Sequence, residues 1–309
     1  MKEIVRKARA ARGLRSYVIK TCRRIIGPGG EPKAPPVWAL RRIFGDYLQV
    51  TADGHPFIVD LRDTVVSYGI VADGAWEEEE TALIRRLIKP GDHVVDVGAH
   101  IGYHAVIFAA AVGSRGKVLA FEPAGDNADL LEINVALNGF EKVVEVLRAA
   151  AGSKPATVHL VRDHGQAETA RGVSNRGAHH VAPVNGADAP LVQLTTVDDA
   201  TAGWERVDAV KIDVEGYEWH VLQGMRQTLA RNIDLVLFVE FWPAAIVRAG
   251  AEPAALLDEL ETQGFSLWEI RRPGGLERYE RGALLKRLSG ATDLVDLLCV
   301  RGAKTAGLG

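Results

Sequence analysis

The chain has few of the residues that mark several classes of protein. Its only cysteines, Cys22 and Cys299, lie near opposite ends of the 309 residues. They form neither a metal-ligand pair nor a disulfide framework, which is typical of proteins from a reducing cytosol. No stretch reaches the roughly 20 apolar residues that span a bilayer, and the N-terminus lacks the apolar run of a signal peptide. We therefore expect a cytoplasmic protein with no transmembrane segment.

The chain also lacks a strong excess of either charge. It has 37 Lys and Arg residues against 40 Asp and Glu residues, which gives a formal net charge of −3. Proteins dedicated to nucleic acid usually carry a basic excess, so we expect no nucleic-acid partner. Apolar residues make up 47% of the chain and charged residues 25%, which predicts a folded core.

The first 26 residues differ from the rest because they are strongly basic. They contain a single acid, Glu3, and apolar residues recur among the basic ones at roughly helical spacing. This segment could dock on a membrane surface or an acidic partner, or it could pack on its own domain or on the second copy of a homodimer. The second interpretation is favoured from composition. We predict a basic helical extension at 1–30, a small β element with its linker at 31–75, and the main domain at 76–303.

Residues 46–71 alternate apolar and polar positions, as β-strands do when one face is buried. Asp53-Gly54 supplies a hairpin turn between two such runs. The pattern predicts a small β element ahead of the main domain.

From residue 77 onward, helical and strand patterns alternate. Acids at 77–80 and basic residues at 85–89 suit the two ends of a helix that Pro90-Gly91 stops. The predicted strands are residues 93–97, 117–121, 143–147, 207–212, 233–241, 265–270 and 295–300, and helices are predicted at 101–112 and 126–138. This alternation predicts an α/β fold with a doubly wound, mostly parallel sheet.

Two stretches interrupt the alternation. Residues 162–190 are rich in Gly, Ala, Asn and His and show little periodicity. A connection of this length favours an active-site lid or a substrate loop. Residues 271–292 are charged and could form a second insertion.

The first chemical signal is the sequence Asp-Val-Gly-Ala-His-Ile-Gly at 96–102, between the first strand of the sheet and its helix. Ligands of open α/β sheets bind beyond the carboxyl ends of the strands, and Gly98 and Gly102 would let backbone approach a ligand closely. The spacing is not that of the Gly-x-Gly-x-x-Gly loop that binds a pyrophosphate. The turn therefore suits a ligand without a diphosphate, and Asp96 could balance an amine or a sulfonium.

Glu122 ends the second strand of the sheet, where an acid is suited to hold ribose hydroxyls. The turn alone is weak evidence, because a tight turn with a capping acid would look the same. The turn and Glu122 together favour a nucleoside ligand.

Four motifs together resemble the FkbM family of class I methyltransferases. They are Asp-Val-Gly-Ala-His-Ile-Gly-Tyr at 96–103, Ala-Phe-Glu-Pro at 120–123, Leu-Asn-Gly at 137–139 and Lys-Ile-Asp-Val-Glu-Gly at 211–216. The resemblance covers about residues 76–270. It implies S-adenosylmethionine as cofactor, a seven-stranded Rossmann-like sheet and, usually, O-methylation.

The resemblance also implies which residues contact the cofactor. By position these are Asp96, Gly98, Ala99, His100, Ile101 and Gly102 in the turn, Glu122 at the ribose, Pro123 and Asn127 beside it, Ala149 and Ala150 near the adenine, and Asp213.

Carboxylates follow two later strands of the predicted sheet and carry the expected chemistry. Asp213 and Glu240 would emerge at the same sheet edge as the turn at 96–102. A hydroxyl acceptor must lose a proton, and we expect Asp213 to take it, with Glu240 second and His179 or His180 third. The same acids could instead hold a divalent cation, but we expect no metal.

The acceptor is predicted to be a hydroxyl on a small molecule, such as a secondary metabolite or a sugar. Tyr217, Trp219 and Trp242 could line an apolar acceptor pocket, although core packing explains them equally well. Trp76 and Glu79 are expected to close over the cofactor. Two other functions are open: a nicotinamide-dependent oxidoreductase and a non-catalytic module that only binds the cofactor.

Overall fold

The computed structural model describes residues 37–162, 179–182 and 189–308. Its centre is an eight-stranded sheet in the order β13-β12-β14-β11-β10-β3-β4-β5. The strands are β3 (His93–Val97), β4 (Lys117–Phe121), β5 (Val144–Leu147), β10 (Ala209–Ile212), β11 (Leu235–Phe241), β12 (Ser266–Arg271), β13 (Gly275–Arg278) and β14 (Val295–Arg301). Strands β5, β4, β3, β10 and β11 run parallel, whereas β14 runs antiparallel between β11 and β12. The predicted doubly wound, mostly parallel α/β fold is confirmed, with β13 as an eighth strand.

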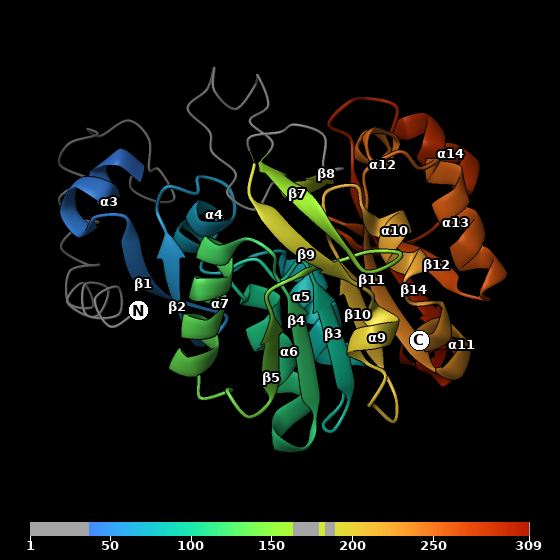
Figure 1. Cartoon of the computed structure of the whole chain (residues 1–309), viewed down its shortest axis with the longest axis horizontal. Helices are drawn as coiled ribbons and strands as arrows, with labels where there is room; N and C mark the ends of the chain where they lie inside the picture. Colours follow the sequence, from blue (N-terminus) through green and yellow to red (C-terminus); the bar gives the residue numbers. More distant parts are fainter. Residues whose placement is uncertain (1–36, 163–178, 183–188, 309) are drawn as a thin grey trace.

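The apolar strands are buried on both faces, as parallel strands covered by helices must be. Val94 contributes to the hydrophobic cluster on one face, with the helices that flank β3 and β4. Val95 and Val97 contribute to the cluster on the other face, with the later helices. The helices of the first group are α5 (Glu78–Leu87), α6 (Tyr103–Val112) and α7 (Gly125–Leu137), and those of the second are α10 (Glu218–Gln223), α11 (Arg226–Arg231), α12 (Pro243–Arg248), α13 (Pro253–Thr262) and α14 (Arg281–Arg287). Figure 1 shows α7 and the N-terminal elements at one end of the molecule and α11 to α14 at the other.

The predicted hairpin is present as β1 (Tyr47–Ala52) and β2 (His55–Asp60), with Asp53-Gly54 at its turn. It is fixed to α7 through Asn134, whose side chain is fully buried. Asn134 Oδ1 accepts a hydrogen bond from the Ile58 backbone N–H at 2.6 Å. Its Nδ2 donates to the carbonyl oxygens of Ile58 at 3.1 Å and Ile101 at 2.8 Å. One side chain therefore joins the hairpin to the end of the turn at 96–102.

The second half of the predicted β element is helical, so the strand prediction for the residues after Asp60 is wrong. Helix α4 (Val66–Asp73) follows β2, and α3 (Val37–Phe44) precedes β1. The Asp63 carboxylate accepts hydrogen bonds from the backbone N–H groups of Val65, at 3.0 Å, and Ser67, at 2.8 Å. An aspartate that bonds backbone two to four residues ahead favours a turn over a strand.

A second, four-stranded sheet is formed by residues on both sides of the stretch 162–190, which was predicted to have little regular structure, and by one short strand within that stretch. Its order is β6-β9-β7-β8, formed by β6 (Ala150–Ala151), β7 (Ala156–Arg162), β8 (His179–Ala182) and β9 (Leu191–Thr195). In Figure 1 it lies above the upper ends of the central strands. The prediction of a structureless loop is thus wrong for residues 179–182, because they pair with β7. The rest of that loop prediction falls on residues 163–178 and 183–188, outside the described residues.

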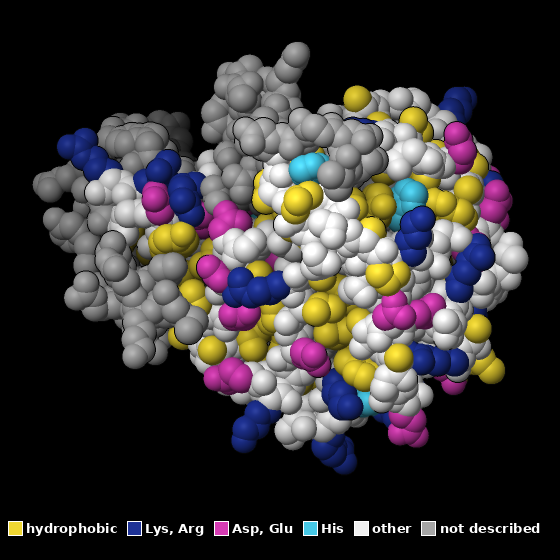
Figure 2. Space-filling model, viewed as in Figure 1, with side chains coloured by type: hydrophobic (Ala, Val, Ile, Leu, Met, Phe, Trp, Pro, Cys, Tyr) yellow, Lys and Arg dark blue, Asp and Glu magenta, His cyan; other side chains and the backbone are white. Residues whose placement is uncertain are grey.

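The remaining elements are short connections: η1 (Gly113–Arg115), α9 (Val197–Ala200) and η2 (Gly302–Leu308). None of the described helices is long and apolar enough to cross a membrane. Figure 2 shows basic and acidic side chains mixed over the described part of one face. The predicted basic helix at 1–26 lies outside the described residues, so its docking role and the homodimer stay predictions.

The Asn134 contacts lead to a prediction about stability. We expect Asn134→Ala to lower the free energy of unfolding by about 2 to 3 kcal/mol, because buried backbone groups lose their hydrogen-bond partner. Urea denaturation measures this change. Asp129→Asn on the same helix is the control, because its side chain is 61% exposed. An Asn134→Ala protein as stable as this control would contradict the role of Asn134 as an anchor.

Candidate active site

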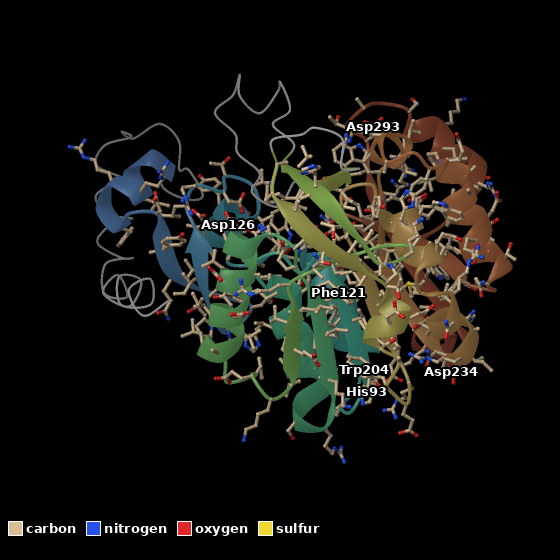
Figure 3. The ribbon with its side chains drawn as sticks, in the orientation of Figure 1. His93, Phe121, Asp126, Trp204, Asp234 and Asp293 are labelled. Carbon is tan, nitrogen blue, oxygen red and sulfur yellow. The ribbon has the colours of Figure 1, made fainter. Side chains whose placement is uncertain are left out.

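A cavity of about 750 Å³ lies at the carboxyl ends of β3, β4, β10 and β11. Leu160 in β7 and His179 and Val181 in β8 line it from the second sheet. The position beyond the carboxyl ends of parallel strands is where open α/β sheets bind ligands. Figure 3 labels Phe121, the last residue of β4, near the centre of the molecule where the cavity begins.

Most residues predicted to contact a cofactor line this one cavity. They are Asp96, Gly98, Ala99 and His100 in the turn after β3, Glu122 and Pro123 after β4, Ala149 and Ala150 after β5, and Asp213 after β10. Glu240 in β11 lines it too. The cavity lining does not include Ile101, Gly102 or Asn127; Ile101 and Asn127 are buried. His180 lies in β8 opposite Val161, and its side chain lies outside what the structure describes.

The turn after β3 is held in a conformation that requires glycine. Gly98 has a φ of +89°, and a β-carbon there would lie 1.9 Å from the Asp213 carbonyl oxygen. Gly102 has a φ of +84°, and a β-carbon there would lie 2.4 Å from Leu131 Cδ1. The N–H groups of Gly98 and Ala99 both donate to the Phe121 carbonyl oxygen, at 3.1 and 2.9 Å. The two glycines therefore let the turn pack against β10 and α7 at once.

Glu122 binds backbone on both sides of the cavity edge. Its Oε2 accepts a hydrogen bond from the His100 N–H, and its Oε1 accepts one from the Ala124 N–H, both at 2.8 Å. Burial raises the pKa of Glu122 to about 7, although these hydrogen bonds and one with Asn127 oppose the change. The carboxylate is thus fixed in orientation at the end of the second strand of the fold.

Lys211 in β10 is a charged residue that the sequence interpretation missed as part of the site. It is 4% exposed, and its Nζ donates to Asp213 Oδ2 at 2.7 Å. The same Nζ lies 3.9 Å from Glu80 Oε1. Asp96 faces Lys211 across the β3–β10 pairing, and burial raises its pKa to about 7. The sequence did contain a signal for Lys211, because it is the one charged residue in the otherwise apolar strand Ala-Val-Lys-Ile.

Two residues far apart in the chain complete this charged region. Glu77, just before α5, pairs through its Oε1 with Arg272 Nη2 at 3.1 Å. Arg272 also contacts the Asp296 carboxylate. Glu77 and Arg272 line the cavity together with Trp76, whereas Glu79, predicted beside Trp76, does not. The charged insertion at 271–292 thus contributes a residue to the site.

Among the described residues, three side chains are arranged so that they could hold a metal ion. They are Glu77, Glu80 and His104, with one ligand atom of each within 4.8 Å of the others. They differ from Asp213 and Glu240, the pair considered from the sequence. Burial lowers the pKa of His104, and the positive charges of Lys211 and Arg272 lower it further.

Glu240 and Glu218 have different environments in spite of their proximity. Glu218 accepts hydrogen bonds from the backbone N–H groups of Val214 at 3.1 Å and Gly216 at 3.0 Å, so it holds the turn that leads into α10. Glu240 Oε2 is buried and has no hydrogen-bond partner among the described residues. Burial, with the negative charge of Asp213 next in importance, raises the pKa of Glu240 well above its usual range.

Two of the three predicted aromatic residues line the cavity. Trp242 donates from Nε1 to the Ala291 carbonyl oxygen at 2.8 Å, and the Arg248 guanidinium lies 5.2 Å from its ring centre. Tyr217 stacks on His220, with ring centres 4.1 Å apart. Trp219 packs instead on the hydrophobic core.

Comparisons with known proteins agree with this geometry. Residues 96–267 match the methyltransferase FkbM domain. The chain is 30% identical over 204 residues to the methyltransferase sdnD of Sordaria araneosa, covering 58% of this chain and 75% of that protein. It is 28% identical over 183 residues to the hexuronic acid methyltransferase AglP of Haloferax volcanii, covering 59% of this chain and 67% of that protein.

A comparison of folds gives weaker similarity. The crystal structure of the O-methyltransferase TomG from Streptomyces achromogenes has a TM-score of 0.41 and 13% identity, and the match covers 72% of this chain and 79% of that one. The family match covers more than half of the chain. The chain therefore belongs to the FkbM family of S-adenosylmethionine-dependent methyltransferases.

Proposed function

We propose that this methyltransferase transfers a methyl group to a hydroxyl of a small-molecule acceptor, such as a secondary metabolite or a sugar. The observation that carries the proposal is that one cavity is lined both by the glycine turn at 96–102 and by Glu240, whose Oε2 is buried and has no hydrogen-bond partner among the described residues. The turn and Glu122 serve the cofactor, and Glu240 serves the acceptor. Both are needed for transfer to a hydroxyl, because that hydroxyl must also lose a proton.

The residues around the turn suit S-adenosylmethionine. Gly98 leaves open the space that a side chain would need, and Glu122 offers fixed carboxylate oxygens to ribose hydroxyls. The small residues Ala149 and Ala150 leave room for the adenine, and Asp96 brings negative charge toward the positive sulfur. When bound, the cofactor supplies a methyl group that its sulfonium has already activated. The chain's task is then to position the acceptor and to remove its proton.

Glu240 is a better proton acceptor than Asp213, which was ranked first from the sequence. Asp213 is paired with the Lys211 ammonium at 2.7 Å, so its Oδ2 already has a partner. Glu240 has no such partner for Oε2, and its pKa is raised by burial. Asp213 then keeps a positioning role beside the cofactor. The role of His180 stays a prediction.

The acceptor end of the cavity combines aromatic and charged side chains. Trp242 and Arg248 line it beyond β11, whereas Tyr217 packs on the cluster of Ala150 and Leu194. An aromatic ring beside acids and a guanidinium suits a compact molecule with several hydroxyls. The hexuronic acid named for AglP is a molecule of this kind. The cavity volume of about 750 Å³ lies within the roughly 300–1,000 Å³ of small-molecule sites.

The two other functions considered from the sequence are not favoured. A nicotinamide-dependent oxidoreductase needs a pyrophosphate site, and the turn at 96–102 lacks that fingerprint. A non-catalytic module would not need the buried Glu240 Oε2, which has no hydrogen-bond partner in the described part of the chain and is therefore costly to keep.

The role of Glu122 predicts a loss of affinity on substitution. We expect Glu122→Gln to weaken binding of S-adenosylhomocysteine about 10- to 100-fold, because a charged acceptor at the ribose is removed. Isothermal titration calorimetry measures this, with Glu132→Gln on α7 as an exposed control. Unchanged affinity would remove Glu122 from the ribose site, and heat with NADH but none with S-adenosylhomocysteine would overturn the function.

The acceptor class predicts the chemical nature of the product. We expect cofactor labelled with ¹³C in its methyl group, incubated with the protein and an extract of its host, to give a product with a methyl carbon bound to oxygen. The carbon chemical shift separates O-, N- and C-methyl groups. A product methylated on nitrogen or carbon would overturn the proposal, and boiled protein is the control.

The role of Glu240 predicts a slow variant with normal cofactor affinity. With cofactor saturating, we expect Glu240→Gln to lower turnover about 10²- to 10⁴-fold. The raised pKa means that the basic form is populated only at higher pH, so wild-type turnover should rise with pH to a plateau. Glu205→Gln, an exposed substitution, is the control. A larger loss of turnover in Asp213→Asn than in Glu240→Gln would indicate that Asp213, and not Glu240, removes the proton.

A further inference from the structure

Three acceptor atoms meet where α5 begins and α6 begins, at one side of the cavity. They are Glu77 Oε2, Glu80 Oε1 and His104 Nε2, and all lie within 4.8 Å of one another. Glu77 Oε2 and His104 Nε2 are 3.7 Å apart. Glu77 and His104 line the cavity, and Glu80 lies behind them. We call these three residues the acceptor triad.

None of the three atoms has a hydrogen-bond partner among the described residues. Glu80 is only 1% exposed and His104 only 7%, so water cannot replace the missing partner freely. Buried polar atoms are nearly always hydrogen-bonded, because an unsatisfied one costs about 1 to 3 kcal/mol. The triad therefore points to a ligand that donates hydrogen bonds.

The charges around the triad indicate that this ligand is positive. Five carboxylates, those of Glu77, Glu80, Asp96, Asp213 and Asp296, surround the two cations Lys211 and Arg272. Lys211 is shared between Glu80 and Asp213, and Arg272 between Glu77 and Asp296. The acids outnumber the cations, and burial raises the pKa of Glu77 to about 7 and that of Glu80 well above its usual range, so a further positive charge would favour their ionised forms.

The positive charge beside the triad suits an ammonium better than a divalent metal ion. Acceptors around an ammonium lie about 2.8 Å from the nitrogen and hence about 4.6 Å apart. Ligands of a zinc ion lie about 2.1 Å from it and hence about 3.4 Å apart. The 3.7 Å between Glu77 Oε2 and His104 Nε2 lies between these two values, so the choice between the two ligands depends on the neighbouring charge. Lys211 Nζ, 3.9 Å from Glu80 Oε1, would also repel a divalent ion more strongly than a single charge.

We propose that the acceptor triad binds the α-ammonium group at the amino-acid end of the cofactor. The inference rests on the proposed cofactor position, in which adenine and ribose lie toward β5 and β4. The triad lies at the opposite side of the same cavity, beside Asp96 and Lys211 of β3 and β10. A nucleoside with its sugar at Glu122 therefore extends its amino-acid chain toward Glu77 and His104.

The test compares two ligands that differ by one group. S-adenosylhomocysteine carries the α-ammonium, and its desamino analogue has hydrogen in that place and keeps the carboxylate. Calorimetry on the full chain should show the wild type binding S-adenosylhomocysteine about 10- to 100-fold more tightly than the analogue. Glu77→Gln should lose most of that preference while binding the analogue as the wild type does.

Matched variants separate recognition from folding. Glu78→Gln lies in the same helical turn but is exposed, and it should keep the full preference. Glu80→Gln should behave like Glu77→Gln with a smaller loss, because Glu80 lies behind the cavity wall. Thermal unfolding of each variant shows whether it is destabilised. If one of the two triad variants is destabilised, the ligand preference of the other one tests the inference.

Three results would overturn the inference. The wild type could bind both ligands equally, or Glu77→Gln and Glu80→Gln could weaken both ligands by the same factor. Elemental analysis could also find a stoichiometric metal in the purified protein, lost from a Glu77→Gln and Glu80→Gln double variant. A wild type that binds neither ligand would instead refute the proposed cofactor position. Failure of the cofactor position can therefore be distinguished from failure of the ammonium assignment.

Discussion

Lys211 is the residue on which the rest of the site depends. A lysine ammonium that is 4% exposed cannot remain charged in a protein interior without carboxylates close to it. Three carboxylates stabilise its charge: Asp213 directly after the same strand, Glu80 in α5 and Asp96 in the neighbouring strand. Removing one member of such a buried group typically costs about 3 to 5 kcal/mol, because it leaves a buried charge without its partner. The position of α5 over the sheet and the charge of the cavity are therefore parts of one arrangement.

This arrangement assigns different tasks to carboxylates that look alike in the sequence. Glu122 is fixed by two backbone N–H groups, Glu218 holds the turn before α10, and Asp213 is paired with a cation. Glu240 keeps an oxygen without a partner. Carboxylates with unlike surroundings have unlike proton affinities, which is how one active site can hold both a binding acid and a base.

The sequence predicted the central sheet well because its strands are largely apolar, as in the run from Leu235 to Val239. It predicted the turn at 96–102 and Glu122 because both follow directly from strands that are easy to recognise. It missed β7 and β9, which are partly exposed strands with mixed residues and little contrast with loops. It also missed Lys211, Glu77 and Arg272 as neighbours, since their contacts join segments more than 60 residues apart and leave no local pattern.

The segment that defines the family ends short of the site on both sides. It runs from residue 96 to residue 267, whereas Glu77 and Glu80 precede it and Arg272 and Asp296 follow it. In a chimaera that exchanged only this segment between two relatives, the turn and Glu122 would come from one protein. The charged residues on either side of the segment would come from the other protein. The boundaries for grafting a working active site thus lie outside the boundaries of the recognisable domain, near residue 76 and residue 300.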